Sequence, residues 1–153
     1  SNIMKKIFAL ILLTFVYSCG YTSIYQELKR DLNINVLSMR GDFEINNYIK
    51  NDLKISSDKS SSNIYNLKIE TEYNKIILAK DATGNATDYN IEMRAKFIVV
   101  SNNNKNIVYE ENFKIKKNDD NFEQSNYERD IKKNFSQIVQ EKLILDLIKL
   151  SDN

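Results

Sequence analysis

Residues 65–74 read YNLKIETEYN and residues 89–99 read YNIEMRAKFIV, and both stretches alternate apolar with polar side chains. A period of two residues is typical of a β-strand that buries one face. The side chains expected to face the core are Tyr65, Leu67, Ile69, Thr71 and Tyr73 in the first stretch, and Tyr89, Ile91, Met93, Ala95, Phe97 and Val99 in the second. The sequence therefore predicts two strands of one sheet.

The segment between these strands predicts a hairpin. The alternation changes parity at residues 75–78, which indicates a bulge or the end of the strand. Residues 81–85 contain Thr83-Gly84 and have the composition of a hairpin loop. After a second turn at residues 101–106, a third strand is predicted, with Ile107, Tyr109, Phe113 and Ile115 facing inward and Glu111 as the odd member of that face.

Two amphipathic helices and one more strand flank this three-strand meander. Residues 32–38 alternate like a strand, and Gly41-Asp42 ends it with Asp42 at the N-cap position of a helix. That helix places Ile45, Tyr48, Ile49 and Leu53 on one face. Near the other end, Ser125 to Glu128 matches a capping box. The helical stripe that follows contains Ile131, Phe135, Ile138, Val139, Leu143, Leu147 and Leu150, widened by Ile144, Leu145 and Ile148.

The element order β-α-β-β-β-α predicts an α+β fold. We expect a two-layer sandwich, in which two helices cover the apolar face of a roughly four-stranded mixed sheet. The first strand can join the meander in one sheet because a helix separates them in sequence. Residues 32–150 are predicted to form this single domain.

Composition restricts the chemistry that the chain can perform. There is no His and one Cys, so nucleophile–His pairs, His metal ligands and internal disulfides are all excluded. Residues 1–18 hold two Lys and no acidic residue, which leaves 20 basic against 21 acidic residues in the remainder. Without an excess of positive charge we expect no nucleic-acid partner. We also expect no cofactor and no enzymatic activity, although chemistry by a carboxylate pair remains formally open.

The first residues predict an export signal. Met4-Lys5-Lys6 precedes an apolar run from Ile7 to Val16, which is shorter than the about 20 residues that span a bilayer. Residues 1–18 are therefore expected to form a signal peptide, with three residues before Met4. Val16-Tyr17-Ser18-Cys19 resembles the bacterial lipobox, which implies that Cys19 carries the lipid anchor and residues 19–31 form a tether. No Asp follows Cys19, which favours the outer membrane.

Three features resemble the LptE family of lipopolysaccharide-assembly lipoproteins. They are the start Cys19-Gly20-Tyr21, the strand and hairpin of residues 65–69 and 81–87, and the closing helix from Tyr127 to Leu147. The resemblance implies a protein without catalytic activity that plugs the LptD β-barrel, helps it to fold and assists lipopolysaccharide insertion at the outer leaflet. Its domain would face the periplasm or the barrel lumen. Where the family often has an Arg after the Ala-Thr of this hairpin, the sequence has Asp88, so a role for that Arg does not carry over.

Lipopolysaccharide is polyanionic, so basic side chains near the hairpin and strand edges are the expected contacts. The candidates are Lys75, Lys80, Arg94, Lys116 and Lys117. Each of them also fits an ordinary solvated surface position. An alternative function is that of another small periplasmic lipoprotein, either an auxiliary of lipid transport or a pilotin-like chaperone of a secretin. Tyr21, Tyr25 and Tyr109 fit either a partner interface or half-buried packing.

Overall fold

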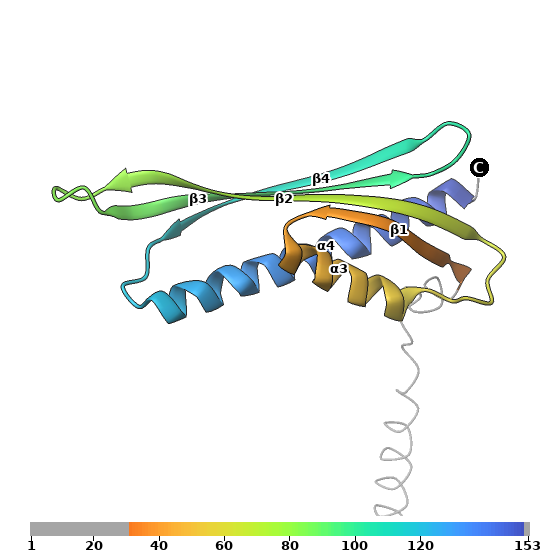
Figure 1. Ribbon diagram of the computed structural model, residues 1–153, viewed down its shortest axis with the longest axis horizontal. Helices are drawn as coiled ribbons and strands as arrows, with labels where there is room; N and C mark the ends of the chain where they lie inside the picture. Colours follow the sequence, from red (N-terminus) through yellow and green to blue (C-terminus); the bar gives the residue numbers. More distant parts are fainter. Residues whose placement is uncertain (1–30, 152–153) are drawn as a thin grey trace, which may run out of the picture.

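A computed structural model describes residues 31–151. The elements follow the order β1 (Asn33–Gly41), α3 (Phe43–Ser56), β2 (Ile64–Lys80), β3 (Ala86–Val99), β4 (Lys105–Lys116) and α4 (Asn121–Ser151). The predicted signal peptide, Cys19 and most of the tether lie outside the described residues. Figure 1 shows one sheet lying over two helices, which confirms the α+β sandwich.

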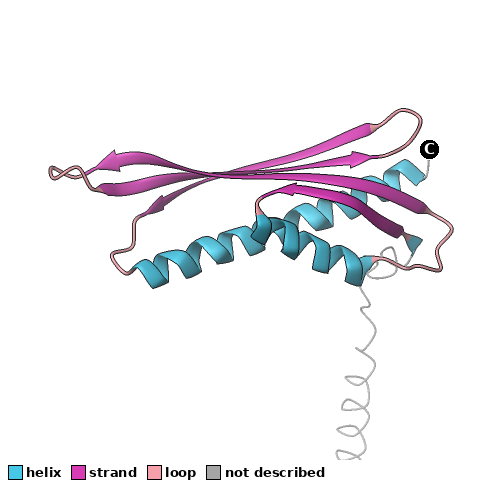
Figure 2. Cartoon of the chain, viewed as in Figure 1, coloured by secondary structure: helices cyan, strands magenta, loops and turns pink. Residues whose placement is uncertain are grey.

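The sheet contains four strands in the order β1-β2-β3-β4. β1 runs parallel to β2, and the other neighbours are antiparallel, so the predicted mixed sheet is confirmed. The β2–β3 hairpin is the longest part of the sheet and projects past the helices at one end of the molecule (Figures 1 and 2). We call this the distal end.

The core lies between the sheet and the helices, where the predicted alternation places it. Buried side chains come from the inner faces of the strands and from one face of each helix. The most deeply buried include Ile45, Ile49, Leu67, Ile91, Phe97, Phe135, Leu143 and Leu147. Asp42 caps α3 as expected, because its Oδ1 accepts a hydrogen bond from the amide of Ile45 at 2.9 Å.

Two predictions about the closing helix are wrong. α4 begins at Asn121 and not after Ser125, because Asp120 Oδ1 accepts hydrogen bonds from the amides of Phe122 at 2.7 Å and Glu123 at 3.2 Å. Ile138 and Leu145 were expected in the apolar stripe, but both are exposed. α3 packs against one side of α4, and the sheet lies above α4. The side of α4 that carries Ile138 and Leu145 therefore has no covering element among residues 31–151.

The parity change at residues 75–78 is a bulge, not the end of the strand. β2 continues to Lys80, and its pairing with β3 shifts register between Ile77 and Ala79 and again before Lys80. The predicted loop at residues 81–85 then connects β2 to β3. The hairpin is therefore long enough to carry its tip away from the helix layer.

Candidate functional site

Three of the five predicted cationic residues gather at the distal end. Lys80 lies opposite Ala86 across the hairpin, and Lys116 lies opposite Asp88 in the neighbouring pair of strands. The amide of Lys117 donates to the carbonyl of Thr87 at 2.8 Å. Lys116 and Lys117 line a hollow of about 380 Å³, and the carboxylates that share it are Asp81, Asp88 and Asp119. The distal end thus presents lysines and carboxylates side by side.

The hairpin loop is held by the side chain of Asp81. Its Oδ1 accepts hydrogen bonds from the amides of Thr83 and Asn85, both at 2.9 Å, and from the hydroxyl of Thr83 at 2.6 Å. The bond from the Thr83 hydroxyl is the largest of the effects that lower the pKa of Asp81. Gly84 adopts φ +90° in this turn, which glycine tolerates without a Cβ penalty. The loop is therefore a turn that is closed by its own side chains.

Lys75 does not belong to this group. It lies on the inner face of β2, where it forms an ion pair with Glu128 of α4. Its Nζ also lies 4.4 Å from the centre of the Tyr89 ring. These contacts compensate most of its charge within the protein.

Arg94 lies on the open outer face of the sheet, away from the hairpin tip. Its guanidinium pairs with Glu110 on β4 at 3.1 Å and with Glu72 on β2 at 3.7 Å. One row along the sheet, Lys96 pairs with Glu70 at 3.3 Å. Charges of opposite sign therefore face each other across neighbouring strands, while Glu70 and Glu72 on β2 and Arg94 and Lys96 on β3 form rows of like charge. The outer face is a polar surface that is largely neutralised by its own ion pairs.

A shallow hollow of about 340 Å³ lies on the same outer face. Its lining is almost entirely polar, and consists of Glu72, Asn74, Glu92, Met93, Arg94, Glu110, Glu111 and Asn112. Among residues 31–151, no group of three or more His, Cys, Asp or Glu side chains is arranged as metal ligands. The outer face is thus suited to contact with water or with a polar partner.

Sequence reasoning missed a run of exposed apolar side chains on β2, just before the hairpin loop. Ile76, Ile77 and Leu78 are 44%, 50% and 49% exposed, and they occupy three successive positions of β2. Phe122 in the first turn of α4 is 73% exposed. The available signal was the run of three apolar residues at the parity change, because consecutive residues of a strand cannot all face one core.

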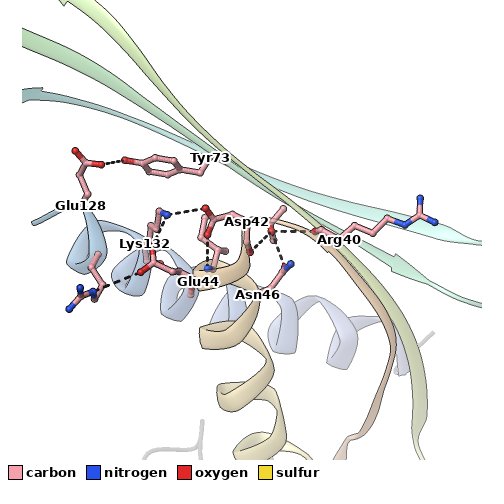
Figure 3. A network of polar contacts seen from close by, with 11 residues as sticks. Arg40, Asp42, Glu44, Asn46, Tyr73, Glu128 and Lys132 are labelled. Carbon is pink, nitrogen blue, oxygen red and sulfur yellow. Dashed lines mark hydrogen bonds and ion pairs between the residues drawn. The ribbon is translucent and has the colours of Figure 1, made fainter. Parts of the chain in front are cut away.

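A polar network joins α4 to the start of α3 and to the middle of β2 (Figure 3). Lys132 Nζ lies 2.9 Å from Asp42 Oδ2 and 2.8 Å from Glu44 Oε2. The same ammonium group lies 4.2 Å from the centre of the Tyr73 ring. The hydroxyl of Tyr73 in turn donates to Glu128 Oε2 at 2.8 Å.

The protonation of this network is fixed by its contacts. Burial by itself lowers the pKa of Lys132, but the two carboxylates outweigh it and raise the pKa above the ordinary value. Burial raises the pKa of Glu128, but hydrogen bonds from Lys75, Gln124 and Tyr73 outweigh it and lower the pKa. Burial first, and then the contact with Glu128, raise the pKa of Tyr73. All three groups therefore keep their usual charge at neutral pH, as in a structural clamp.

Within residues 31–151, no helix is long and apolar enough to cross a bilayer. Any attachment to a membrane through Cys19 concerns a residue outside the described part of the chain.

The chain matches no protein-family model and no curated protein sequence. Its fold is similar to the crystal structure of the rare lipoprotein B from Shewanella oneidensis, with 13% identity, a TM-score of 0.54, and coverage of 76% of this chain and 99% of that chain. A putative lipoprotein from Caulobacter crescentus has 11% identity and a TM-score of 0.49, with coverage of 85% of this chain and 96% of that chain. At such low identity the likeness to the Shewanella protein shows a shared fold alone.

Proposed function

We propose that this protein is a lipid-anchored accessory protein of the outer membrane, which occupies the lumen of an LptD-like β-barrel and assists lipopolysaccharide transport. The proposal assigns it no catalytic role. The observation that carries it is the outer face of the sheet, where ion pairs such as Arg94–Glu110 and Lys96–Glu70 cover three strands. The interior of a large outer-membrane barrel is polar, so a rigid domain with such a face is suited to it.

Two further observations support this function. The sequence Val16-Tyr17-Ser18-Cys19 resembles a lipobox, and this supplies the membrane anchor. The fold is similar to that of a rare lipoprotein B, a protein that is itself described as a lipoprotein. The anchor is tested by Cys19→Ala, which should release the protein from membranes. An unchanged membrane fraction would contradict it.

The distal end is the part of the domain best suited to contact lipopolysaccharide. Lys80, Lys116 and Lys117 are exposed there. Lys75 and Arg94, by contrast, are engaged by carboxylates within the protein. The first group therefore retains more charge for an anionic headgroup. Ile76, Ile77 and Leu78 are exposed on β2 just before Lys80, and they suit the acyl part of an amphiphile.

Charge reversal at the distal end tests this contact. Lys80→Asp combined with Lys116→Asp should weaken binding of purified lipopolysaccharide in vitro. The matched control is Lys133→Asp combined with Lys142→Asp, which reverses two exposed lysines on α4. Equal binding by the two double variants would show that the contacts lie elsewhere.

The partner is tested by purification of a tagged copy from solubilised outer membranes. We expect a β-barrel protein to accompany it. Recovery of a secretin would favour a pilotin-like chaperone, and recovery of an inner-membrane transporter would favour an auxiliary of lipid transport.

A further inference from the structure

The exposed face of α3 combines lysines with apolar side chains. Within α3, Phe43–Ser56, which the structure describes in full, the exposed positions are Phe43, Asn47, Lys50, Asn51, Lys54 and Ile55. Phe43 and Ile55 are 77% and 84% exposed, the highest values among the large hydrophobic side chains of residues 31–151. None of these six positions of α3 carries a carboxylate. The face is therefore both apolar and cationic.

Both carboxylates of α3 lie on the side of the helix that faces α4. Glu44 pairs with Lys132 at 2.8 Å and with Arg129 at 3.8 Å. Asp52 lines a hollow of about 170 Å³ between the two helices. Among residues 31–151, by contrast, no carboxylate forms an ion pair with Lys50 or Lys54. The charges of these two lysines therefore remain available to a partner.

The chain enters the domain beside the C-terminal end of α3. Ser57 is the C-cap of this helix, and its Oγ accepts a hydrogen bond from the amide of Ile34 at 2.8 Å. Cys19 precedes Asp31, the first described residue, by 12 positions. A stretch of 12 residues spans at most about 40 Å, so a lipid anchor at Cys19 keeps this end of α3 within that distance of the membrane.

The exposed face of α3 lies on the opposite side of the molecule from the outer face of the sheet. Ile45, Ile49 and Leu53 of α3 belong to the core beneath the sheet, and Figure 2 shows the sheet on one side of the helices only. When α3 contacts a flat surface, the outer face of the sheet therefore points away from that surface and stays accessible.

We propose that the exposed face of α3 docks on an anionic phospholipid bilayer, the surface to which Cys19 attaches the chain. Phe43 and Ile55 would enter the headgroup region, and Lys50 and Lys54 would lie at the level of the lipid phosphates. The inference rests on the lipid anchor of the proposed function and goes beyond it, because that function assigns no role to α3.

The chemistry of the face suits this occupant. An amphipathic helix lies in the membrane interface by burying aromatic and aliphatic side chains at the headgroup boundary. Each lysine near an anionic leaflet adds to the attraction, and its aliphatic stem can lie along the apolar layer while the ammonium group stays in water. Two lysines and two apolar side chains bind weakly by themselves. An anchor holds the bilayer next to them, and two weak signals together give stable attachment.

The exposed side of α4 does not select an anionic surface in the same way. It carries Asp130 and Glu141 together with Lys133 and Lys142, so charges of both signs are exposed there. We therefore assign the membrane contact to α3.

Tryptophan fluorescence of the lipidated full-length protein in vesicles tests the contact. The chain has no Trp, so Phe43→Trp introduces one reporter on α3, and Val108→Trp introduces a control on the outer face of β4. The vesicles contain phosphatidylcholine with brominated acyl chains, which quench a Trp that enters the bilayer, and phosphatidylglycerol. We expect the quenching of Phe43→Trp to be several times that of Val108→Trp. Equal quenching would overturn the proposal, and it is the result expected if the face binds a protein.

Charge reversal tests the role of the lysines. When added to Phe43→Trp, Lys50→Glu combined with Lys54→Glu should lower the quenching to the level of Val108→Trp. Lys105→Glu combined with Lys114→Glu, at exposed positions of β4, changes the net charge equally and should leave the quenching unchanged. High salt should also lower the quenching of Phe43→Trp, because it screens exposed charges. Equal quenching by the two charge reversals would overturn the proposal.

Failure of the anchor gives a different result. All variants retain Cys19, so protein that does not sediment with vesicles of phosphatidylcholine alone would contradict the anchor. Quenching of Phe43→Trp by vesicles with phosphatidylglycerol would still report the contact of α3.

Discussion

The hydroxyl of Tyr73 donates a hydrogen bond to Oε2 of Glu128 at 2.8 Å, and so joins the middle of β2 to the N-terminal half of α4. Above the same ring lies Lys132, whose ammonium group holds two carboxylates at the start of α3. Three elements therefore meet at one aromatic side chain. The position of the projecting hairpin relative to the helices depends on this contact.

Lys132→Met should destabilise the domain by about 2 kcal/mol. The substitution keeps the aliphatic stem but removes the counter-ion of Asp42, and leaves Glu44 to Arg129, whose Nε lies 3.8 Å away. The site is largely enclosed, since the Lys132 side chain is only 11% exposed. Urea denaturation measures the change, and Lys133→Met at an exposed neighbouring position is the control. A loss of unfolding free energy no greater than that of the control would mean that the contacts of Lys132 with Asp42 and Glu44 add little to stability.

Glu128 should make stability depend on acid pH. Its folded-state pKa lies below the ordinary value of 4.5, so its contribution is present above pH 4.5 and is lost as the pH falls through the folded-state pKa. The free energy of unfolding of Glu128→Gln should therefore fall less steeply below pH 4.5 than that of the parent. Glu141→Gln, at an exposed position on α4, should retain the parental slope. Parallel pH profiles for Glu128→Gln and the parent would refute this role.

Tyr109→Phe should cost about 1 kcal/mol. The Tyr109 hydroxyl donates to Asp146 Oδ2 at 2.7 Å and ties β4 to α4, while the ring packs edge-on against Phe97 and is retained in the variant. Thermal denaturation measures the change, and the control is Tyr127→Phe, because Tyr127 is 52% exposed. The prediction fails if both variants unfold at the parental temperature.

Gly41→Ala should destabilise the fold by about 3 kcal/mol or more. Gly41 has φ +102°, and a Cβ there would collide with the carbonyl oxygen of Thr71. Gly84 also has a positive φ, of +90°, but a Cβ at this position would meet no neighbouring atom. Gly84→Ala should therefore cost only about 1–2 kcal/mol in free energy of unfolding. Denaturant titration measures the free energy of unfolding of both variants, and the difference between their losses reports the collision at residue 41. Equal losses would show that the structure shifts to relieve this collision.

The strands and the first helix were predictable because local patterns decide them. The alternation in residues 65–73 and 89–99 identifies the inner face of β2 and β3, and the buried residues follow it. Asp42 could be identified as a cap because Gly41 before it and the apolar stripe after it mark the same boundary. Here local sequence and tertiary contacts agree.

The start of α4 was mispredicted because two possible caps compete in this region. Ser125 to Glu128 fits a capping box, but Asp120 caps the helix five residues earlier. Gln124 then accepts a hydrogen bond from the amide of Asn118 at 2.7 Å, and Glu128 turns toward β2. Long-range contacts of Glu128 therefore replace the local capping bond.

The candidate cations could not be ranked from sequence. Lys80 on β2 and Lys116 on β4 lie at the same end of the sheet only because of strand register. The charges of Lys75 and Arg94 are compensated by Glu128 and Glu110, which belong to other elements. These partners are far away in the sequence, so the sequence alone could not identify them.

The measurement that tests the proposed function most directly is recovery of the partner from outer membranes. A tagged copy, cross-linked in cells and purified after detergent extraction, should bring with it one outer-membrane β-barrel of LptD size. A matched copy that reverses Arg94 and Lys96 to Glu on the outer face should recover less of it while remaining folded and anchored. Recovery of a secretin or an inner-membrane transporter in place of a barrel, or no barrel at all, would contradict the account.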